Sequence, residues 1–429
     1  MGACRIRPIT RPGTAKTPSN ASGALAAFRS RPFAWFWPCL VTSLTGVWVR
    51  ITAQGYLVYD LTDNELLLGL VSFANAAPVL IASPIAGAIL DRVDRRRVLQ
   101  AVQTVQGLSI LVLAILVATD RIEVWHVLVV AAVIGFASGF DWPARLATIP
   151  LLVEKHQLKS AVALTAAAFN GSRIVGPAIG GVLAGTIGIA ACFFLNAALY
   201  LPLVLVLAFI PIRAQSLREK SDSTTRASLR SSATGEVAEG YRYIWRTPTI
   251  RGLLSVDIVP LAFGISYFTL APAVAKDVLG LGETGLGILL ACNGIGSLAG
   301  TVLVALMTGI RRRGRVIVAG VGLFGLTIVL YALSGNVILS CVLIGLLGLI
   351  ASTYATLNDM LVQTLVDDAY RGRVLSVYSM LWGLTPIGGL IGGAMANVVG
   401  VQTALVINGF LVLLYVPVLY RFTPVPRID

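Results

Sequence analysis

Long apolar segments that follow one another along the chain constrain its fold more than any other feature. A helix needs about 20 apolar residues to cross the hydrocarbon core of a bilayer, and 56% of this chain is hydrophobic. Only 12% is charged, against about 25% in soluble domains. We therefore expect an all-α integral membrane protein, with helices over 33–59, 66–90, 98–118, 125–147, 161–187, 189–210, 249–275, 284–308, 316–334, 337–358, 373–397 and 401–420.

The basic residues predict how this chain is oriented in the membrane. Lys and Arg collect in cytoplasmic loops, and with the N-terminus placed inside, this side holds all 33 of them except Arg50, Arg121, Arg173 and Lys276. We expect a multi-pass protein of a bacterial inner membrane with both termini in the cytoplasm. Because the basic residues are scattered and lack stacking aromatics, the net charge of +13 does not indicate nucleic-acid binding.

A long polar stretch separates the predicted helices into two groups of six. The domain organisation we predict is a cytoplasmic tail 1–32, a six-helix bundle 33–210, a cytoplasmic linker 211–248, a second six-helix bundle 249–421 and a tail 422–429.

The two groups of helices repeat in sequence. Residues 68–75 are similar to residues 286–293, and Gly180 corresponds to Gly393. Parallel repeats with an even number of helices are related by an axis along the membrane normal, and they enclose a cavity at mid-membrane. Asn75 and Asn293 occupy matching positions in the two repeats, which favours a site between them.

The loop between the second and third predicted helices carries a charged motif of Gly87, Asp91, Arg92, Arg95 and Arg96. It resembles the helix 2–3 signature of the major facilitator superfamily, with Asp94 in place of a Gly. The segments 48–54, 57–62, 141–145 and 169–177 resemble the efflux branch of that superfamily, which includes siderophore and macrolide exporters. The resemblance implies twelve transmembrane helices in two parallel-repeat bundles, alternating access, and a gating role for the motif. A basic loop that only fixes topology is the alternative.

The fifth predicted helix contains Gly176, Pro177, Gly180 and Gly181. This run resembles the antiporter motif of drug–proton exporters, which implies export driven by a proton gradient with no cofactor. Small residues four apart allow close helix contact, and a proline removes one backbone hydrogen bond, so a hinge is plausible here. Ordinary helix packing is the alternative.

Besides Asp359 near a cytoplasmic helix end, five charged residues lie within or near the ends of predicted spans: Arg50, Asp141, Arg145, Arg173 and Asp257. An ionised group at the bilayer centre costs at least about 2.5 kcal/mol, so such residues usually have a function. Burial disfavours the charged form of a carboxylate, whereas a nearby guanidinium favours that form. Separating such a pair would therefore let the carboxylate take up a proton. We therefore treat these residues as candidates for proton coupling. A structural ion pair of Asp141 with Arg145 or Arg173 is the alternative.

Polar and aromatic side chains inside the spans are candidates for the wall of the substrate cavity. They are Gln54, Asn75, Asn170, Asn293, Asn358, Tyr378 and Trp382. Hydrogen bonding between helices, worth about 0.6 kcal/mol on average, is the alternative.

The sequence therefore predicts a secondary transporter that exports a small amphipathic molecule such as a drug, macrolide or siderophore. We expect it to work as a monomer among membrane lipids, without metal or nucleic acid. A lipid or lysolipid transporter on the same fold is one alternative, and a non-transporting membrane scaffold or receptor is another. An enzyme is not expected, because the two histidines offer no catalytic set and the five cysteines no metal-ligand spacing.

Overall fold

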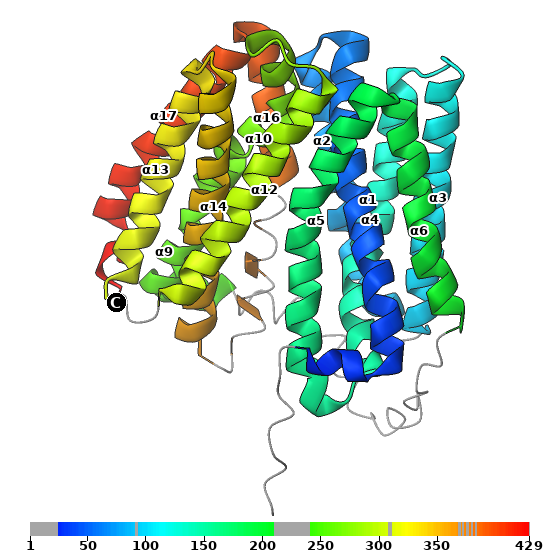
Figure 1. Ribbon diagram of the computed structural model, residues 1–429. Coiled ribbons are helices and arrows are strands. Elements are labelled where there is room, and N and C mark those ends of the chain that lie inside the picture. The colour runs from blue at the N-terminus through cyan, green and yellow to red at the C-terminus, as the bar shows by residue number, and fades with distance from the viewer. Residues whose placement is uncertain are drawn as a thin grey trace, which may run out of the picture.

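A computed structural model describes residues 25–90, 93–209, 241–307, 311–367, 370, 373–374, 377–378, 381 and 384–428. Two helical bundles stand side by side with their long axes nearly parallel (Figure 1). The N-terminal bundle contains α1 (Arg31–Thr62), α2 (Glu65–Leu90), α3 (Arg95–Ala118), α4 (Val124–Leu152), α5 (Leu158–Thr186) and α6 (Ile189–Phe209). The C-terminal bundle contains the segment Pro248–Val278, α12 (Glu283–Leu306), α13 (Arg313–Leu333), α14 (Val337–Leu365), α16 (Leu384–Val399) and α17 (Val401–Phe422).

Ten helical segments of the described chain are long and apolar enough to cross a membrane. Helix α5 is also long enough, at 29 residues and about 43 Å, but it is more polar because it contains Asn170 and Arg173. Helix α16 has 16 residues and is preceded by positions outside the described residues. The prediction of an all-α membrane fold in two bundles is confirmed.

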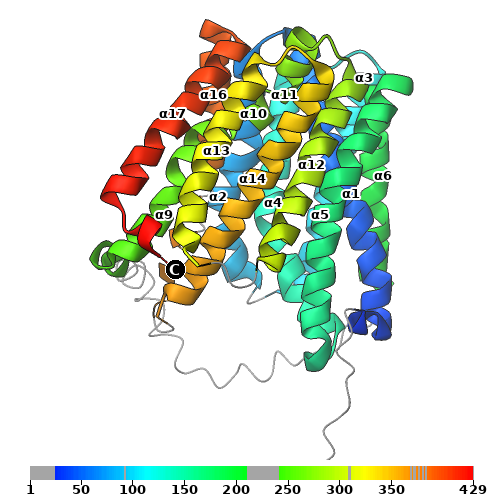
Figure 2. The same cartoon turned by 60° about the vertical axis from the view of Figure 1, so that its left-hand side comes forward.

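The helices of the two bundles pack in the same pattern. Helix α2 packs on α4 as α12 packs on α14, and α3 packs on α6 as α13 packs on α17. Between the bundles, α5 packs on α12 and α16 packs on α2. In both contacts the fifth helix of one bundle meets the second helix of the other. Figure 2 shows α5 and α12 side by side at the junction of the bundles. This pairing agrees with the sequence repeat.

The predicted continuous helix over 249–275 is wrong in one respect, because the structure breaks it. Helix α9 (Pro248–Val256) ends at Asp257, a π-helical turn covers Pro260–Gly264, and short pieces lead to a second π-turn at Val274–Val278. Pro260 has no N–H to donate, and the amide of Ile265 reaches back to its carbonyl at 3.0 Å. A π-turn widens a helix locally and is frequent at functional sites. Asp257 therefore lies directly before the interrupted part of this span.

Apolar side chains cover the outer surface of the bundles. On α3, Leu108, Val112 and Ile115 are exposed and follow one face of the helix. Exposing such a surface to water would be unfavourable, whereas in lipid an apolar surface needs no protein partner. The exposed faces therefore match the membrane location that the sequence predicts.

Candidate transport site

Glycines bring the two bundles into backbone contact at the end of the molecule where α1 meets α2. A methyl group on Gly181 of α5 would lie 2.6 Å from the Cα of Gly287 on α12. The symmetric contact joins α2 and α16, where a methyl group on Gly393 would lie 3.0 Å from the Cα of Gly69. No side chain larger than hydrogen fits at these places. We call this end of the molecule the closed end.

Polar side chains complete the contact at the closed end. Lys276 binds Asp63 at 2.8 Å and Asp60 at 3.2 Å, and its ammonium group lies over the ring of Tyr59. The hydroxyl of Tyr59 donates a hydrogen bond to Asp277. All of these pairs join α1 or its end to the last turn of the segment Pro248–Val278.

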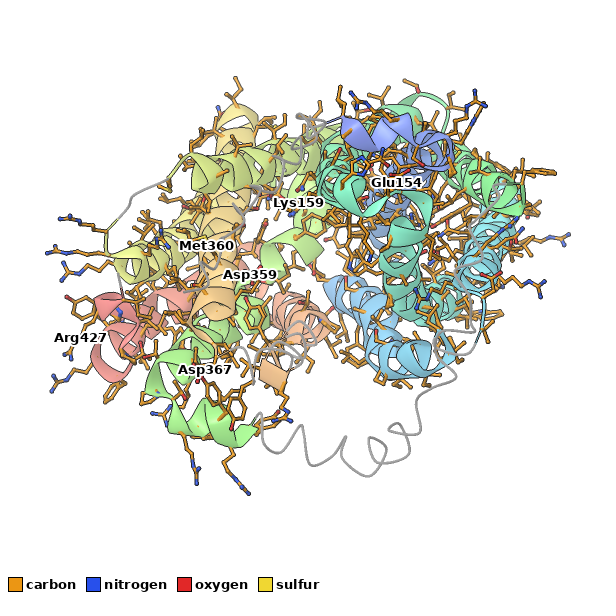
Figure 3. All side chains as sticks on the ribbon, turned by 90° about the horizontal axis from the view of Figure 1, so that it is seen from below. Glu154, Lys159, Asp359, Met360, Asp367 and Arg427 are labelled. Carbon is orange, nitrogen blue, oxygen red and sulfur yellow. The ribbon has the colours of Figure 1, made fainter. Side chains whose placement is uncertain are left out.

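The opposite end, where α17 finishes, has fewer links between the bundles. Within the described residues, every hydrogen bond between bundles involves Tyr59, Arg173, Gly181 or Lys276, which lie at the closed end or near mid-membrane. At the opposite end a methyl group on Gly87 would meet nothing within 4 Å. Figure 3 looks onto this end, with Asp359 near the inner side of the C-terminal bundle. We call it the open end.

A cavity of about 80 Å³ lies between the bundles, below the closed end. Its wall combines residues of α1 and α2 with residues of the C-terminal bundle: Ile51, Thr52, Gln54, Gly55, Val58, Leu68, Val71, Ser72, Asn75, Phe268, Thr269, Pro272, Leu286 and Leu290. The structure thus places two of the predicted cavity residues, Gln54 and Asn75, at this wall. Ser72 and Thr269 add hydroxyl groups that the sequence prediction did not include.

Arg50 lies immediately behind this wall and donates hydrogen bonds to the side-chain amides of Gln54 and Asn75. Its guanidinium donates to Oε1 of Gln54 and, at 3.2 Å, to Oδ1 of Asn75. Arg50 is 5% exposed, and no carboxylate in the described part of the chain pairs with it. The Nε of Arg50 and the Nε2 of Gln54 are buried without a partner. A buried cation thus stands next to the cavity without a counter-charge.

Arg173 of α5 joins the bundles near mid-membrane. Its Nη2 donates to Oδ1 of Asn293 at 3.3 Å, and its guanidinium lies 5.6 Å from the ring centre of Trp48. Asn293 in turn donates to the hydroxyl of Tyr267 at 3.0 Å. Among the residues that can be described, Arg173 also has no carboxylate partner. Asn75 and Asn293, which match in the sequence repeat, therefore both accept from an arginine of the N-terminal bundle.

Asp141 and Arg145 form an ion pair inside the N-terminal bundle. The Nε of Arg145 lies 2.7 Å from Oδ2 of Asp141, and Gln103 donates to Oδ1 of Asp141 at 2.5 Å. Ser43 closes the ring, accepting from Arg145 at 3.0 Å and donating to Gln103 at 2.9 Å. Of the two partners considered for Asp141, the structure selects Arg145. Both carboxylate oxygens are satisfied here, so the ring has the character of a structural contact.

Two carboxylates share one hydroxyl group in the C-terminal bundle. The hydroxyl of Tyr378 lies 2.9 Å from Oδ2 of Asp257 and 2.5 Å from Oδ1 of Asp359. Asn358 donates to the same oxygen of Asp257 at 2.8 Å. Neither carboxylate pairs with a Lys or Arg of the described residues. Tyr378 and Asn358, predicted for the cavity wall, instead belong to this carboxylate cluster of Asp257, Asn358, Asp359 and Tyr378.

The remaining predicted residues fall in other places. The amide of Asn170 donates to Ala166 on its own helix at 2.9 Å, and Asn170 does not line the cavity. Asp91, Arg92 and Trp382 lie outside the described residues.

The arginines of the charged motif contact helix ends of their own bundle. Arg95 donates to the carbonyl of Ala147 at 3.4 Å, and Arg96 donates to that of Ala208. A cation is favoured near the carbonyl end of a helix by its dipole. Asp94 accepts from the amide of Arg96 at 3.0 Å and caps α3 with φ −58°. Because this φ is negative, a glycine is not needed at that position.

The glycine motif of α5 is a packing surface on two sides. A methyl group on Gly176 would lie 2.9 Å from the carbonyl oxygen of Thr45, and one on Gly180 would lie 3.1 Å from that of Val49. These contacts hold α5 against α1, whereas Gly181 and the carbonyl of Pro177 face Gly287 of α12. The motif therefore lies where the bundles meet.

Comparison with known proteins decides the family. A family model described as transmembrane secretion effector, one of the major facilitator superfamily, matches residues 22–429. The chain belongs to this family. The protein is therefore a multi-pass membrane transporter, and the resemblance seen in the sequence motifs is confirmed.

Several named proteins are similar to this chain in sequence or in structure. The chain is 27% identical to the multidrug efflux pump Tap of Mycolicibacterium fortuitum, over 84% of this chain and 88% of the pump. It is 26% identical to the staphyloferrin A transporter of Staphylococcus aureus, over 85% of this chain and 89% of that protein. Among solved structures, a bacterial homologue of the lysosomal transporter Spinster, in an inward-facing and unoccupied conformation, superposes with a TM-score of 0.72. It is 11% identical and covers 93% of this chain and 97% of its own, so it supports the fold alone.

Within this family fold, sequence reasoning missed two groups of residues. The first is the polar contact of Tyr59, Asp60, Asp63, Lys276 and Asp277 at the closed end. A usable signal existed, because Tyr59 and Asp277 are 218 positions apart, the same spacing as Asn75 and Asn293. The second is Asp359, whose place beside Asp257 depends on how three helices pack.

Proposed function

We propose that this protein is a proton-coupled secondary exporter of a small amphipathic compound, working by alternating access in a bacterial inner membrane. The carboxylate cluster carries the proposal for coupling. A phenol has one proton and can donate it to only one carboxylate. The contact of the Tyr378 hydroxyl with a second carboxylate at 2.5 Å therefore needs another proton, carried by Asp257 or Asp359.

The loading step uses this shared proton. Asp257 is 7% exposed and has no cation beside it among the described residues, so its charged form is disfavoured in this state. Asp359 lies in the last part of α14, which ends at Leu365 on the side of the open end. We assign proton entry and exit to Asp359 and proton holding to Asp257. Asp141 is the weaker candidate, because Arg145 already neutralises it.

The loops support placing the open end in the cytoplasm. Arg95, Arg96 and Arg97 lie there, as do the basic residues 311–315, whereas the closed end carries Asp60, Asp63 and Glu65. Cytoplasmic loops are enriched in Lys and Arg. With both termini inside, the described conformation would accept its substrate from the cytoplasm, as an exporter must. Gly87, Asp91, Arg92, Arg95 and Arg96 would then form the gate that meets the other bundle when the open end closes.

The wall of the cavity supports an amphipathic substrate. It presents amides and hydroxyls from Gln54, Asn75 and Ser72 on one side and the apolar side chains of Phe268 and Leu290 on the other. The relatives are named as a multidrug pump and a siderophore transporter, which also fits such a compound. We expect the protein to act as a monomer surrounded by lipid. A lipid transporter, scaffold or receptor is not favoured, because the relatives carry transporter names.

Transport by the purified full-length protein in proteoliposomes tests the proposal. The interior is set acidic, and uptake is followed for a panel of fluorescent dyes, macrolides and siderophores, while a trapped pH dye reports proton movement. We expect at least one compound to accumulate with the gradient and to release protons from the lumen. In Asp257→Asn and Asp359→Asn, gradient-driven accumulation falls at least tenfold while exchange without a gradient continues.

Asp120→Asn is the matched control, because Asp120 is an exposed carboxylate in a loop and should leave both activities unchanged. Accumulation that ignores the pH gradient would contradict proton coupling. Full coupling in both carboxylate variants would remove the cluster from the mechanism.

A further inference from the structure

The cavity beside Arg50 combines a buried cation with amide groups of fixed orientation. A guanidinium has donors only, so the groups that face it, Oε1 of Gln54 and Oδ1 of Asn75, must be oxygens. The NH₂ groups of these amides therefore point away from Arg50. That of Asn75 donates to the carbonyl of Val71 at 3.0 Å.

The NH₂ group of Gln54 has no acceptor. Gln54 is 3% exposed, and its Nε2 is buried without a partner, although the residue lines the cavity. A buried donor without an acceptor is unfavourable unless a ligand supplies one. The site thus offers a free donor in front of a positive charge.

No residue of the cavity wall is acidic. The positive charge of Arg50 is not cancelled by any carboxylate within the described residues, and Arg173 adds a second unpaired cation on the other side of Trp48. Trp48 itself packs edge-on to Phe268 of the cavity wall. In a surrounding of low dielectric, such charges act strongly on a ligand. The electrostatics of the cavity therefore favour an anion.

The size of the cavity limits what part of a ligand it can hold. Its volume of about 80 Å³ corresponds to two or three water molecules, whereas sites for whole drug-sized molecules enclose about 300–1,000 Å³. A carboxylate group fits, and the rest of the molecule would extend toward the open end along Phe268 and Leu290.

We propose that the transported compound carries a carboxylate, which the Arg50–Gln54–Asn75 group binds while its apolar part lies against the C-terminal bundle. The inference rests on the proposed transport function and names its substrate class. The Nε2 of Gln54, which is enclosed in the described conformation, turns into the cavity to donate to one carboxylate oxygen, and Arg50 stabilises the charge from behind the amides. Arg173 adds to the positive potential without touching the ligand.

Binding of matched probes to the full-length protein in lipid nanodiscs at pH 7.5 tests this. The probes share one pyrene ring: 1-pyrenebutyrate is anionic, 1-pyrenebutanol neutral and 1-pyrenemethylamine cationic. We expect the wild type to bind the butyrate at least tenfold more tightly than the butanol. In Arg50→Gln this preference disappears through weaker binding of the butyrate alone, and in Gln54→Glu it disappears as well, because the new carboxylate pairs with the guanidinium of Arg50.

Two further variants keep the result interpretable. Arg50→Lys keeps the charge and should keep most of the preference, which separates loss of charge from loss of fold. Arg121→Gln removes an exposed arginine in a loop and should change nothing. Equal affinity for the butyrate and the butanol in the wild type, or an undiminished preference in both Arg50→Gln and Gln54→Glu, would overturn the proposal. So would a preference that vanishes when isethionate, a sulfonate, in the buffer is replaced by chloride, since the site would then hold a small inorganic anion.

The binding assay contains no pH gradient. Failure of proton coupling would therefore leave the probe preference intact, and equal affinity of the wild type for the butyrate and the butanol would leave coupled transport of a neutral compound intact. The two proposals can fail separately.

Discussion

Tyr59 donates a hydrogen bond to Asp277, the residue at the matching position in the second half of the chain. Equivalent residues can touch only where they lie close to the symmetry axis that relates the two bundles. The end of α1 and the end of the segment Pro248–Val278 therefore meet on this axis, at the closed end. Together with Lys276 and its two aspartates, this pair links the two bundles at the closed end.

We expect Tyr59→Phe to make the closed end open more often, because it removes a hydrogen bond to a charged group. The loss is about 1.5 kcal/mol or more, which corresponds to about tenfold or more in the open-to-closed ratio. Labelling of Ser72→Cys by a membrane-impermeant thiol reagent, in a background without other cysteines, measures it. Asp277→Asn should have a similar effect and add little to Tyr59→Phe. Additive effects would mean that the two residues act independently, and Tyr420→Phe at an exposed site is the control.

Gly287→Ala should destabilise the closed conformation more strongly. The added methyl group would lie 2.5 Å from the Cα of Gly181, and backbone cannot move aside as a side chain can. We expect at least a tenfold rise in thiol labelling from the closed side and a matching loss of transport. Gly282→Ala is the control, because a methyl group there meets nothing within 4 Å. Equal labelling of both variants would show that the glycine contact does not limit opening.

Asp141→Asn should lower stability, because it leaves the guanidinium of Arg145, 1% exposed, without its counter-charge. Breaking a buried pair from one side costs about 3 kcal/mol or more. Thermal unfolding in detergent measures this loss, and Asp141→Asn combined with Arg145→Met should recover part of it. From the sequence alone we expected Asp141 to be a candidate for proton coupling. Unchanged thermal stability together with lost proton coupling would restore that expectation.

Pro260→Ala should straighten the segment Pro248–Val278, because alanine supplies the missing N–H and is favoured within a helix. We expect higher thermal stability, by about 1 kcal/mol, but weaker proton coupling, since Asp257 would turn away from Tyr378. Proton release and unfolding temperature are measured on the same sample. Pro417→Ala, inside α17, is the control. Coupling that survives in Pro260→Ala would mean that the bend has no part in proton loading.

The sequence predicted well those features that depend on local pattern. Apolar length located the helices, and the repeat of residues 68–75 in 286–293 predicted that Asn75 and Asn293 occupy matching positions, where the structure shows that each accepts from an arginine. The spacing of Asp141 and Arg145 placed them on one face of α4. Helix ends were less accurate, and α4 and α14 run past their predicted ends to Leu152 and Leu365, because polar residues can remain helical beyond the hydrocarbon core.

Features that depend on packing between distant helices could not be predicted from the sequence. Prolines such as Pro143 remain inside regular helices, so Pro260 gave no sign that its own helix would break. Asp359 and Tyr378 approach Asp257 only because three helices converge. Arg50 was predicted only as a candidate for proton coupling, and the structure pairs it with two amides.

The glycine contacts of Gly181 with Gly287 and of Gly69 with Gly393 bear on how the molecule moves. Two smooth backbone surfaces can roll over each other without first withdrawing interlocked side chains. Because the two points lie symmetrically about the axis, they define a line about which one bundle can tilt as a rigid body. The energy barrier to reorientation would then be set by breaking the ionic links at the rim, a few weak bonds that a change in protonation or occupancy can outweigh.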